Sequence, residues 1–447
     1  MAHAVLACSL ITDYALESKK DGPGPDDSGA SDNTQPPIDS PFEDVSIVDA
    51  DPGPMCTVKP CVVEIVAAVQ NTCARLDDGV VKCWGWNDTG AVGAAQQDAN
   101  FATPQTVALD GPADEIAIGG WPFDYATACA RRGTVIDCWG ADGNDHMLGR
   151  GAASTASNFN PAPGPVSGLT GATGGIAIGG KRVCVRVGDS LSCWADDYTS
   201  PKGNGNVQDA ATPFAPPKPV KQIAGGRSHH CVVYDTEDVA CFGHQEWYEP
   251  LWNAPDSGRG PGGATLKDVG GVTGIAQIAT QANHTCALKK TGVVLCWGRN
   301  RRGELGRGTT SDIEPIPAPV TLPRPAKRIG TGTAHTCAIL DDDTVWCWGS
   351  NGLKNGGNKP IQSRGQIGAS ADGGVDDRSL TPRRVEGLPA GVKRAVVAGY
   401  AHTCVLMADG SVYCFGSNDH GQLGLGPLAD GGQADTVPHQ TPSKVIF

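Results

Sequence analysis

Seventeen cysteines are the residues best placed to do chemistry in this sequence of 447 residues. Fourteen of them form seven pairs whose members lie nine or ten positions apart, and two more lie five positions apart. The pairs are Cys73 and Cys83, Cys129 and Cys138, Cys184 and Cys193, Cys231 and Cys241, Cys286 and Cys296, Cys337 and Cys347, Cys404 and Cys414, and the short pair Cys56 and Cys61. Structural zinc ligands usually come as Cys-x2–4-Cys knuckles, which spacings of nine or ten do not match. We therefore predict disulfides, and with them an oxidising compartment.

The spacing within a pair fits two neighbouring strands of an antiparallel hairpin. If Cys73 faces Cys83, Asp77-Asp78-Gly79 becomes a three-residue loop, whose last position is left-handed and favours glycine. Pairs that are nine apart leave two-residue loops such as Gly133-Thr134, in which glycine comes first, as a type I′ or II′ turn allows. Facing residues at a non-hydrogen-bonded site come within about 4.5 Å between Cα atoms, which a disulfide can bridge. We predict one disulfide inside each of seven hairpins.

Histidine is the second residue type that could do chemistry. It recurs two residues before the first cysteine of four pairs, as His229, His284, His335 and His402. Four ligands of one zinc ion must all lie about 2 Å from the metal, and equivalent positions around a ring converge only on its axis. We therefore favour a structural role, in which each imidazole bonds the backbone of a turn. The chain also lacks a phosphate-binding loop, an HExxH or G-x-S-x-G motif and an EF-hand loop. The sequence predicts no metal, no cofactor and no catalytic residue.

The elements that position these residues form a repeat. The first cysteine of the pairs recurs about every 55 residues, a period typical of propeller blades. Each repeat contains an Ile- or Val-containing strand, two cysteine strands and a last strand that follows a Pro-rich segment. An aromatic residue follows each second cysteine, and we expect it to fill the space between adjacent blades. Four strands in seven repeats predict an all-β, seven-bladed β-propeller, closed by packing of blade 7 on blade 1 without a shared blade.

The best-defined repeats resemble a known family. His335-Thr336-Cys337-Ala338-Ile339-Leu340, followed by Val345-Trp346-Cys347-Trp348-Gly349-Ser350-Asn351, is similar to the regulator-of-chromosome-condensation repeat. The resemblance covers roughly residues 62–447, and it implies a seven-bladed propeller. Members of that family include a nuclear guanine-nucleotide exchange factor and a secreted bacterial inhibitor of β-lactamases. The fold alone does not carry the function.

The N-terminal segment gives a compartment hypothesis. Residues 5–8, Val-Leu-Ala-Cys, resemble the lipobox of bacterial lipoproteins, in which the cysteine is lipidated; the alternative is a free Cys8 at a frayed terminus. Only seven residues precede Cys8, so we expect the true signal to begin upstream. Residues 1–8 are thus interpreted as a truncated signal-like segment, 9–55 as a disordered acidic linker rich in Pro, Ser and Gly, and 56–447 as the propeller. We expect an outer-membrane lipoprotein of the bacterial envelope, or an extracellular protein.

Candidate binding residues come from loops that the topology places on one face of the propeller. Trp, Tyr and Arg dominate interface hot spots, and loops on a rigid scaffold are where binding usually resides. The candidates are Trp121, Phe123 and Tyr125 in blade 2, Trp247, Tyr248 and Trp252 in blade 4, and Arg299, Arg301, Arg302 and Arg307 in blade 5. The alternative is that the aromatics pack within their own loops and the arginines are solvated.

These observations favour a non-enzymatic binding or scaffold protein, anchored in the envelope or secreted, whose partner is a protein or a glycan. One alternative is a regulator of another protein, by nucleotide exchange or by inhibition of a secreted enzyme. Another is an enzyme whose loop-built site has no recognisable motif. The net charge of −13 argues against nucleic acid, because phosphate binding needs clustered Lys and Arg. We expect a monomer that contacts membranes only through its N-terminal lipid.

Overall fold

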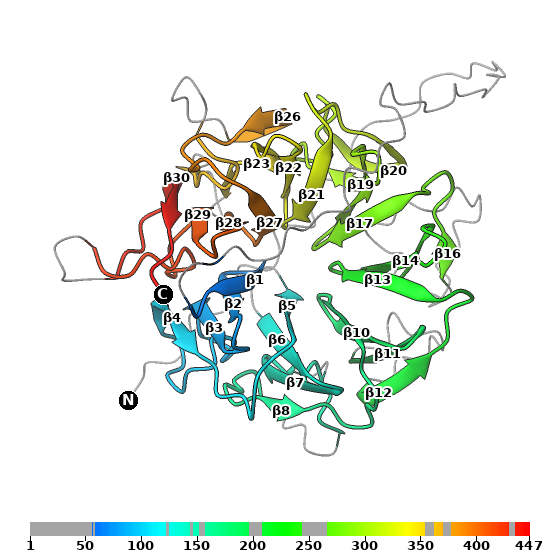
Figure 1. The fold of residues 1–447 in the computed structure, drawn as a ribbon, viewed down its shortest axis with the longest axis vertical. Coiled ribbons are helices and arrows are strands. Elements are labelled where there is room, and N and C mark those ends of the chain that lie inside the picture. Colours follow the sequence, from blue (N-terminus) through cyan, green and yellow to red (C-terminus); the bar gives the residue numbers. More distant parts are fainter. Residues whose placement is uncertain are drawn as a thin grey trace, which may run out of the picture. The chain divides into compact units, whose positions relative to one another are not determined.

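The computed structural model describes residues 56, 59–121, 125–143, 146–151, 157–195, 208–243, 266–353, 362–369, 377–428 and 434–447. All of them belong to one compact unit, Phe42–Phe447. Within these ranges there is no helix that is both long enough and apolar enough to cross a membrane. Seven four-stranded antiparallel sheets surround a central axis (Figure 1), so the predicted seven-bladed β-propeller is confirmed.

The first four blades hold β1 to β16. Blade 1 comprises β1 (Val62–Ala68), β2 (Asn71–Leu76), β3 (Val81–Trp86) and β4 (Asn100–Thr106). Blade 2 comprises β5 (Glu115–Trp121), β6 (Tyr125–Arg132), β7 (Val135–Gly140) and β8 (Gly164–Pro165). Blade 3 comprises β9 (Gly174–Ile178), β10 (Arg182–Val187), β11 (Ser190–Ala195) and β12 (Gln208–Phe214). Blade 4 comprises β13 (Val220–Gly225), β14 (His229–Tyr234), β15 (Val239–Gly243) and β16 (Lys267–Asp268).

The last three blades hold β17 to β30. Blade 5 comprises β17 (Ile275–Thr280), β18 (His284–Lys289), β19 (Val294–Asn300) and β20 (Ser311–Pro319). Blade 6 comprises β21 (Ala326–Thr331), β22 (His335–Leu340), β23 (Val345–Ser350) and β26 (Arg378–Arg384), with the small pair β24 (Gly352–Leu353) and β25 (Gln362–Ser363) between the last two. Blade 7 comprises β27 (Lys393–Ala398), β28 (His402–Met407), β29 (Val412–Gly416) and β30 (His439–Lys444). In each blade the four strands are called A, B, C and D in chain order.

The two middle strands of every blade form the predicted hairpin, in which the two cysteines face each other. The facing cysteines lie 4.0 to 4.1 Å apart between Cα atoms and are joined by disulfides. The seven bonds, in blade order, join Cys73 to Cys83, Cys129 to Cys138, Cys184 to Cys193, Cys231 to Cys241, Cys286 to Cys296, Cys337 to Cys347 and Cys404 to Cys414. All seven predicted pairings are therefore confirmed, one in each blade.

The turns of these hairpins have the predicted chemistry. Gly79 (φ 82°) ends the three-residue loop of blade 1, and Gly133 (φ 61°) begins the two-residue loop of blade 2. Both take the left-handed conformation that their turns require, which an L side chain rarely adopts. Turn chemistry and disulfide position therefore agree, as the sequence predicted.

The hydrophobic core consists of separate clusters between adjacent blades. Trp84 of blade 1 packs with Leu406, Val412 and Leu423 of blade 7, and Trp348 of blade 6 packs with Leu288 of blade 5. The aromatic after each second cysteine is at most 2% exposed in all seven blades. The prediction that these aromatics fill the space between blades is confirmed.

The ring closes by contact between blade 7 and blade 1. Strand A of every blade packs against strand A of the next one, and β27 packs against β1 in the same way. The amide of Tyr400 in blade 7 donates to the carbonyl of Val69 in blade 1 over 2.8 Å. Blade 7 takes all four strands from the C-terminal part of the chain. Within the part of the chain that the structure describes, no blade is shared between the two ends, as predicted.

A further disulfide joins Cys56 to Cys61 at this closing junction, as the short spacing predicted. The Cys61 amide donates to Asp77 Oδ1 over 3.1 Å, and the Cys61 carbonyl accepts the Asp77 amide over 2.9 Å. A Cβ built on Gly410, in the turn between β28 and β29, would lie 2.8 Å from the Cβ of Cys61 and 3.0 Å from Cys56 Sγ. The Cys56–Cys61 disulfide thus packs on the turn of blade 7, while Cys61 is bonded to blade 1.

Candidate partner-binding face

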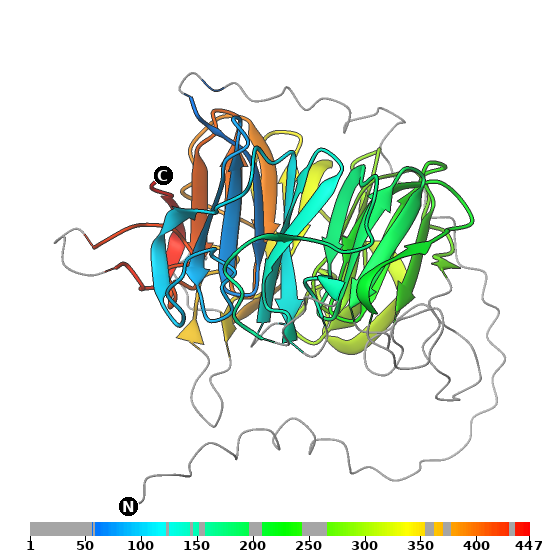
Figure 2. The same cartoon turned by 90° about the horizontal axis from the view of Figure 1, so that it is seen from below.

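The two faces of the propeller carry connections of different length. At the loop face strand A ends and strand B begins, and strand C ends and strand D begins, so both kinds of connection start and finish there. The A–B connections span 69–70, 122–124, 179–181, 226–228, 281–283, 332–334 and 399–401, and the C–D connections span 87–99, 141–163, 196–207, 244–266, 301–310, 351–377 and 417–438. The hairpin face holds the B–C turns (77–80, 133–134, 188–189, 235–238, 290–293, 341–344 and 408–411) and the D–A connections (107–114, 166–173, 215–219, 269–274, 320–325 and 385–392). Figure 2 shows the strands running between these faces, viewed from the side. Every C–D connection exceeds every connection of the hairpin face in length.

A buried asparagine organises the C–D connection of blade 5. Asn300 Oδ1 accepts the amide of Leu305 over 3.2 Å, and its Nδ2 donates to the carbonyl of Thr309 over 3.0 Å. In blades 1, 6 and 7 an asparagine at the start of the C–D connection likewise accepts a backbone amide through Oδ1; these are Asn87, Asn351 and Asn418. One asparagine side chain therefore supplies a hydrogen-bond partner to the backbone of a sharp bend and fixes the start of each of these connections.

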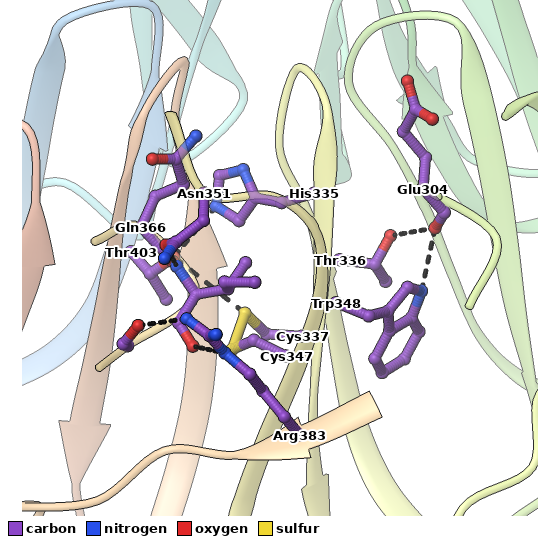
Figure 3. The surroundings of a disulfide bond; sticks show 12 residues. Glu304, His335, Thr336, Cys337, Cys347, Trp348, Asn351, Gln366, Arg383 and Thr403 are labelled. Atoms are coloured by element: carbon purple, nitrogen blue, oxygen red, sulfur yellow. Dashed lines mark hydrogen bonds between the residues drawn. A yellow bond between two sulfur atoms is a disulfide. The ribbon is translucent and has the colours of Figure 1, made fainter. Parts of the chain in front are cut away.

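The same connection bonds to the next blade. The carbonyl of Glu304 in blade 5 accepts the indole Nε1–H of Trp348 over 2.8 Å and the hydroxyl of Thr336 over 3.0 Å, both from blade 6 (Figure 3). The Gln422 carbonyl of blade 7 accepts Trp84 and Thr72 of blade 1 in the same way. The aromatic after the second cysteine therefore packs between blades and also positions the neighbouring loop.

The row of histidines holds blades together through threonine hydroxyls. His335 Nε2 lies 2.9 Å from Thr403 Oγ1 of the next blade, and the Thr403 hydroxyl donates to the Gln366 carbonyl over 2.7 Å. Because the hydroxyl proton is used on that carbonyl, Nε2 of the histidine must carry its own proton and donate. The same bond joins His229 to Thr285, His284 to Thr336 and His402 to Thr72. The predicted hydrogen bond from each imidazole to turn backbone is therefore wrong. The sequence of a single repeat contains no signal for a threonine of the next blade.

Burial keeps these imidazoles neutral. It lowers the pKa of His284 and His335 to about 3 and that of His229 and His402 to about 4. Each imidazole bonds the neighbouring blade, so the four do not converge on the axis. No group of three or more His, Cys, Asp or Glu side chains within the described ranges is arranged to hold a metal ion.

Two of the four candidate arginines are engaged inside blade 5. Arg307 bonds the carboxylate of Glu314 and the carbonyls of Cys296 and Ile316, and its side chain is 16% exposed. Arg299 lies within β19 rather than in the connection that follows, 3.7 Å from the buried carboxylate of Glu304 and 14% exposed. We leave both residues out of the binding surface proposed below, because these side chains are committed to contacts within their own blade.

The other two arginines lie on the loop face. Arg302 Nη1 is 4.0 Å from Asp377 Oδ2 of blade 6, so it spans the junction between blades 5 and 6. Arg301 is 44% exposed and pairs with the 79% exposed Asp312 over 2.9 Å. A pair this exposed contributes little to stability, which leaves Arg301 available to a partner.

The candidate aromatics are only partly within the described residues. Trp121 ends β5 and faces Tyr125 at the start of β6, so the extra residues of blade 2 lengthen its A–B hairpin. Tyr125 is 43% exposed at the edge of the loop face. Phe123, Trp247, Tyr248 and Trp252 lie outside the described residues, as do Cys8 and the rest of residues 1–55.

Sequence reasoning missed a set of contacts between blades on the loop face. Arg364 of blade 6 bonds Asp419 of blade 7, and His420 of blade 7 bonds Asn100 of blade 1 over 3.0 Å while stacking on Trp86 at 4.8 Å. Arg364 and His420 each directly precede a glycine of a C–D bend, as Arg302 does. That shared position before glycine was the signal that could have identified them.

A cavity of about 640 Å³ runs along the propeller axis. All seven A strands line it, mainly with isoleucine, valine and alanine. Two arginines, Arg328 of blade 6 and Arg394 of blade 7, are its charged lining residues among those described. The wall therefore combines apolar side chains with the polar side chains of Gln277, Thr280 and Thr331, and its two arginines lie on one side.

Comparison with known proteins is consistent with this geometry. Two models of the regulator of chromosome condensation (RCC1) repeat match the chain, one at residues 275–304, 326–354 and 394–422 and the other at 291–339 and 409–447. The chain is thus a seven-bladed β-propeller in which residues 275–354 and 394–447 are similar to the RCC1 repeat.

The curated relatives are matched over part of their length. The chain is 29% identical over 218 residues to the ultraviolet-B receptor UVR8 of Arabidopsis thaliana, covering 48% of this chain and 46% of the receptor. It is 32% identical over 154 residues to the human regulator of chromosome condensation, covering 34% and 33% of the two chains. The chain thus matches less than half the length of either relative. The solved structure of Prp20p from Saccharomyces cerevisiae superposes with a TM-score of 0.66 at 16% identity, covering 87% of this chain and 88% of that one, and shows the shared fold.

Proposed function

We propose that this propeller is a non-enzymatic scaffold that binds a protein partner through its loop face in an oxidising compartment. The observation that carries the proposal is that every long connection leaves and re-enters a rigid, closed ring at the same face. Loops held by a rigid scaffold are the usual location of binding residues, because the scaffold bears the cost of ordering them. On that face Arg301 and Tyr125 are exposed, and both are residue types enriched in interface hot spots.

The disulfides support the choice of compartment. Fourteen cysteines are paired within hairpins, and each of these is at most 4% exposed. Disulfides in such number persist outside the reducing cytosol. We propose further that Cys8 carries a lipid and that residues 9–55 separate the propeller from a membrane. This proposal places the protein in a bacterial envelope.

Regulation of another protein is a second candidate, favoured by the match to the human regulator of chromosome condensation. The structure of Prp20p is described together with its binding properties to Gsp1p and histones, which are protein partners. Such a role would use a surface contact of the kind proposed above, and it would differ in the identity and compartment of the partner. The disulfide content favours a regulator of an extracytoplasmic protein over one that acts in the cytosol.

Photo-crosslinking from defined positions tests which face binds. A photoreactive amino acid replaces Tyr125 or Arg301 on the loop face, and the matched controls replace the exposed Asp189 or Arg324 on the hairpin face. The full chain is expressed in its own cell, irradiated and analysed for discrete crosslinked protein bands. We expect a discrete partner from the loop-face positions and none from the hairpin-face controls.

Two outcomes would contradict the proposal. Equal crosslinking from Asp189 or Arg324 would remove the assignment of the face. Absence of any discrete protein adduct at both loop-face positions would argue against a protein partner there. A glycan partner would instead be detected as an adduct that resists protease and is removed by glycosidases.

A further inference from the structure

The axial cavity has the dimensions and the wall chemistry of a small-molecule site. Its volume of about 640 Å³ lies within the range of pockets that hold small ligands, roughly 300–1,000 Å³. Apolar side chains line it around the ring, among them Ile118 of blade 2, Ile178 of blade 3 and Ala279 of blade 5. Gln277, Thr280 and Thr331 add polar groups to the wall. Ligand pockets typically combine such a wall with a few polar groups that orient the ligand.

The cavity is bridged at its loop-face end. Gln281, just after β17 in blade 5, donates from Nε2 to the carbonyl of Ala67 in blade 1 over 2.8 Å. Blades 1 and 5 are not neighbours, and Figure 1 shows β1 and β17 on opposite sides of the axis. The Gln281 side chain therefore crosses the axis beside Ala67 and Thr280, which line the cavity. A ligand would enter from the hairpin face.

The charged groups lie toward the entrance. Arg328 and Arg394 stand near the starts of β21 and β27, and strand A begins on the hairpin face in every blade. The backbone carbonyl of Lys327 accepts a hydrogen bond from Arg328 Nη1 over 2.8 Å, which holds the guanidinium at the strand start. The lining contains these two arginines and no acidic residue among the described residues.

Acidic residues do occur at matching positions of blades 1 and 2, but they are engaged elsewhere. Glu64 pairs with Arg75 over 2.7 Å and accepts the amide of Ile116. Glu115 accepts the amides of Gly175 and Ile176 in blade 3. Neither carboxylate lines the cavity, and both lining arginines lie on the side of blades 6 and 7.

We propose that the axial cavity binds an amphipathic monocarboxylate, such as a medium-chain fatty acid. The alkyl chain lies along the isoleucine, valine and alanine wall, where its burial is favourable in proportion to area. The carboxylate lies at the hairpin-face entrance, where it accepts charge-assisted hydrogen bonds from Arg328 and Arg394. This site is separate from the loop face and does not depend on the protein-binding role proposed above.

Calorimetric titration with decanoate, below its micelle concentration, tests the site on the full chain. Arg328→Gln and Arg394→Gln remove the head-group contacts, and Arg324→Gln is the matched control because it is a salt-bridged arginine of the same face outside the cavity. Decanol, which has the same chain without the charge, separates head-group from tail contacts. Ala279→Phe fills the cavity, and its urea midpoint shows whether that variant still folds.

We expect one decanoate per chain, about tenfold weaker binding for each cavity arginine variant, and unchanged binding for Arg324→Gln. Decanol should bind wild type and Arg328→Gln equally, and folded Ala279→Phe should bind neither ligand. No saturable decanoate binding to wild type would overturn the proposal. An equal loss in Arg324→Gln, or equal sensitivity of decanol to Arg328→Gln, would overturn the assignment of the head group. If Ala279→Phe does not fold, the comparison of Arg328→Gln and Arg394→Gln with Arg324→Gln still tests the proposal.

Discussion

Acidification from pH 7 to pH 5 should destabilise the propeller through its buried histidines. His230, His284, His335 and His402 are each at most 2% exposed. Burial lowers the pKa to about 3 for the first three and to about 4 for His402. An unfolded histidine has a pKa near 6.5, so between about pH 6.5 and pH 4 the unfolded chain takes up protons that the folded protein does not bind. Stability is therefore lost as the pH falls through this window.

The magnitude follows from the pKa difference. At pH 5 an unfolded histidine gains about 2 kcal/mol from protonation relative to pH 7, while a folded group with a pKa of 3 to 4 gains almost nothing. Four such groups together correspond to roughly 8 kcal/mol, which is comparable to the 5–15 kcal/mol total stability of ordinary domains. Burial raises the pKa values of Glu64 and Glu304, so their protonation on acidification stabilises the folded protein. The net loss of stability is therefore smaller than the histidine contribution alone.

A single-site variant separates the histidine contribution from the rest. His335→Gln removes one titrating group, and it also weakens the bond to Thr403 at every pH. We expect a lower urea midpoint at pH 7, but a loss between pH 7 and pH 5 that is about 2 kcal/mol smaller than in wild type. Intrinsic fluorescence reports the transition, because five tryptophans that follow the second cysteines are buried. An unchanged loss between the two pH values in His335→Gln would refute the reasoning.

Three further changes test other parts of the structure. Replacing Cys337 and Cys347 together by alanine removes one within-hairpin disulfide and should lower the free energy of unfolding in urea by about 2–3 kcal/mol. An unchanged free energy of unfolding would contradict a stabilising role of this disulfide. Burial raises the pKa of the Glu304 carboxyl, so its ionised form destabilises the folded protein at pH 7. Glu304→Gln should therefore raise the free energy of unfolding at pH 7, and the increase should shrink toward pH 4. A lower free energy of unfolding at pH 7 would contradict this. Gly332→Ala places a Cβ 2.5 Å from Cε1 of His335 and 2.6 Å from a backbone oxygen, and should cost about 1–3 kcal/mol; an unchanged melting temperature would contradict this.

Local chemistry made the hairpins predictable. The spacing of Cys73 and Cys83 and the glycine at position 79 depend on one another within a single turn, so the sequence specifies pairing, register and turn together. Asp343 takes the equivalent left-handed position in blade 6, with a φ of 65°, a conformation that aspartate tolerates. Glu237 takes the same conformation in blade 4 (φ 66°), although glutamate is not a residue type that indicates a left-handed position.

Contacts between blades were not predictable from a single repeat. His335 and Thr403 are 68 positions apart, and each residue alone is compatible with bonding to a local turn. Gln281 bonds a carbonyl 214 positions away across the axis, with no periodic signal. Arg307 resembled an exposed loop arginine, but a long side chain can fold back on its own strand, and its carboxylate partner Glu314 lies in the next strand. Residue type and approximate position therefore identified the loop face, while burial decided which of its side chains remain available.

The most direct test of the central claim is non-reducing peptide mass mapping of the full chain purified from its native cells without added reductant. A disulfide-bonded propeller in an oxidising compartment should show seven within-hairpin crosslinks, a Cys56–Cys61 crosslink and a lipid on Cys8. Free thiols in the hairpin pairs, together with an unmodified Cys8, would contradict it and would favour a regulator that acts in the cytosol.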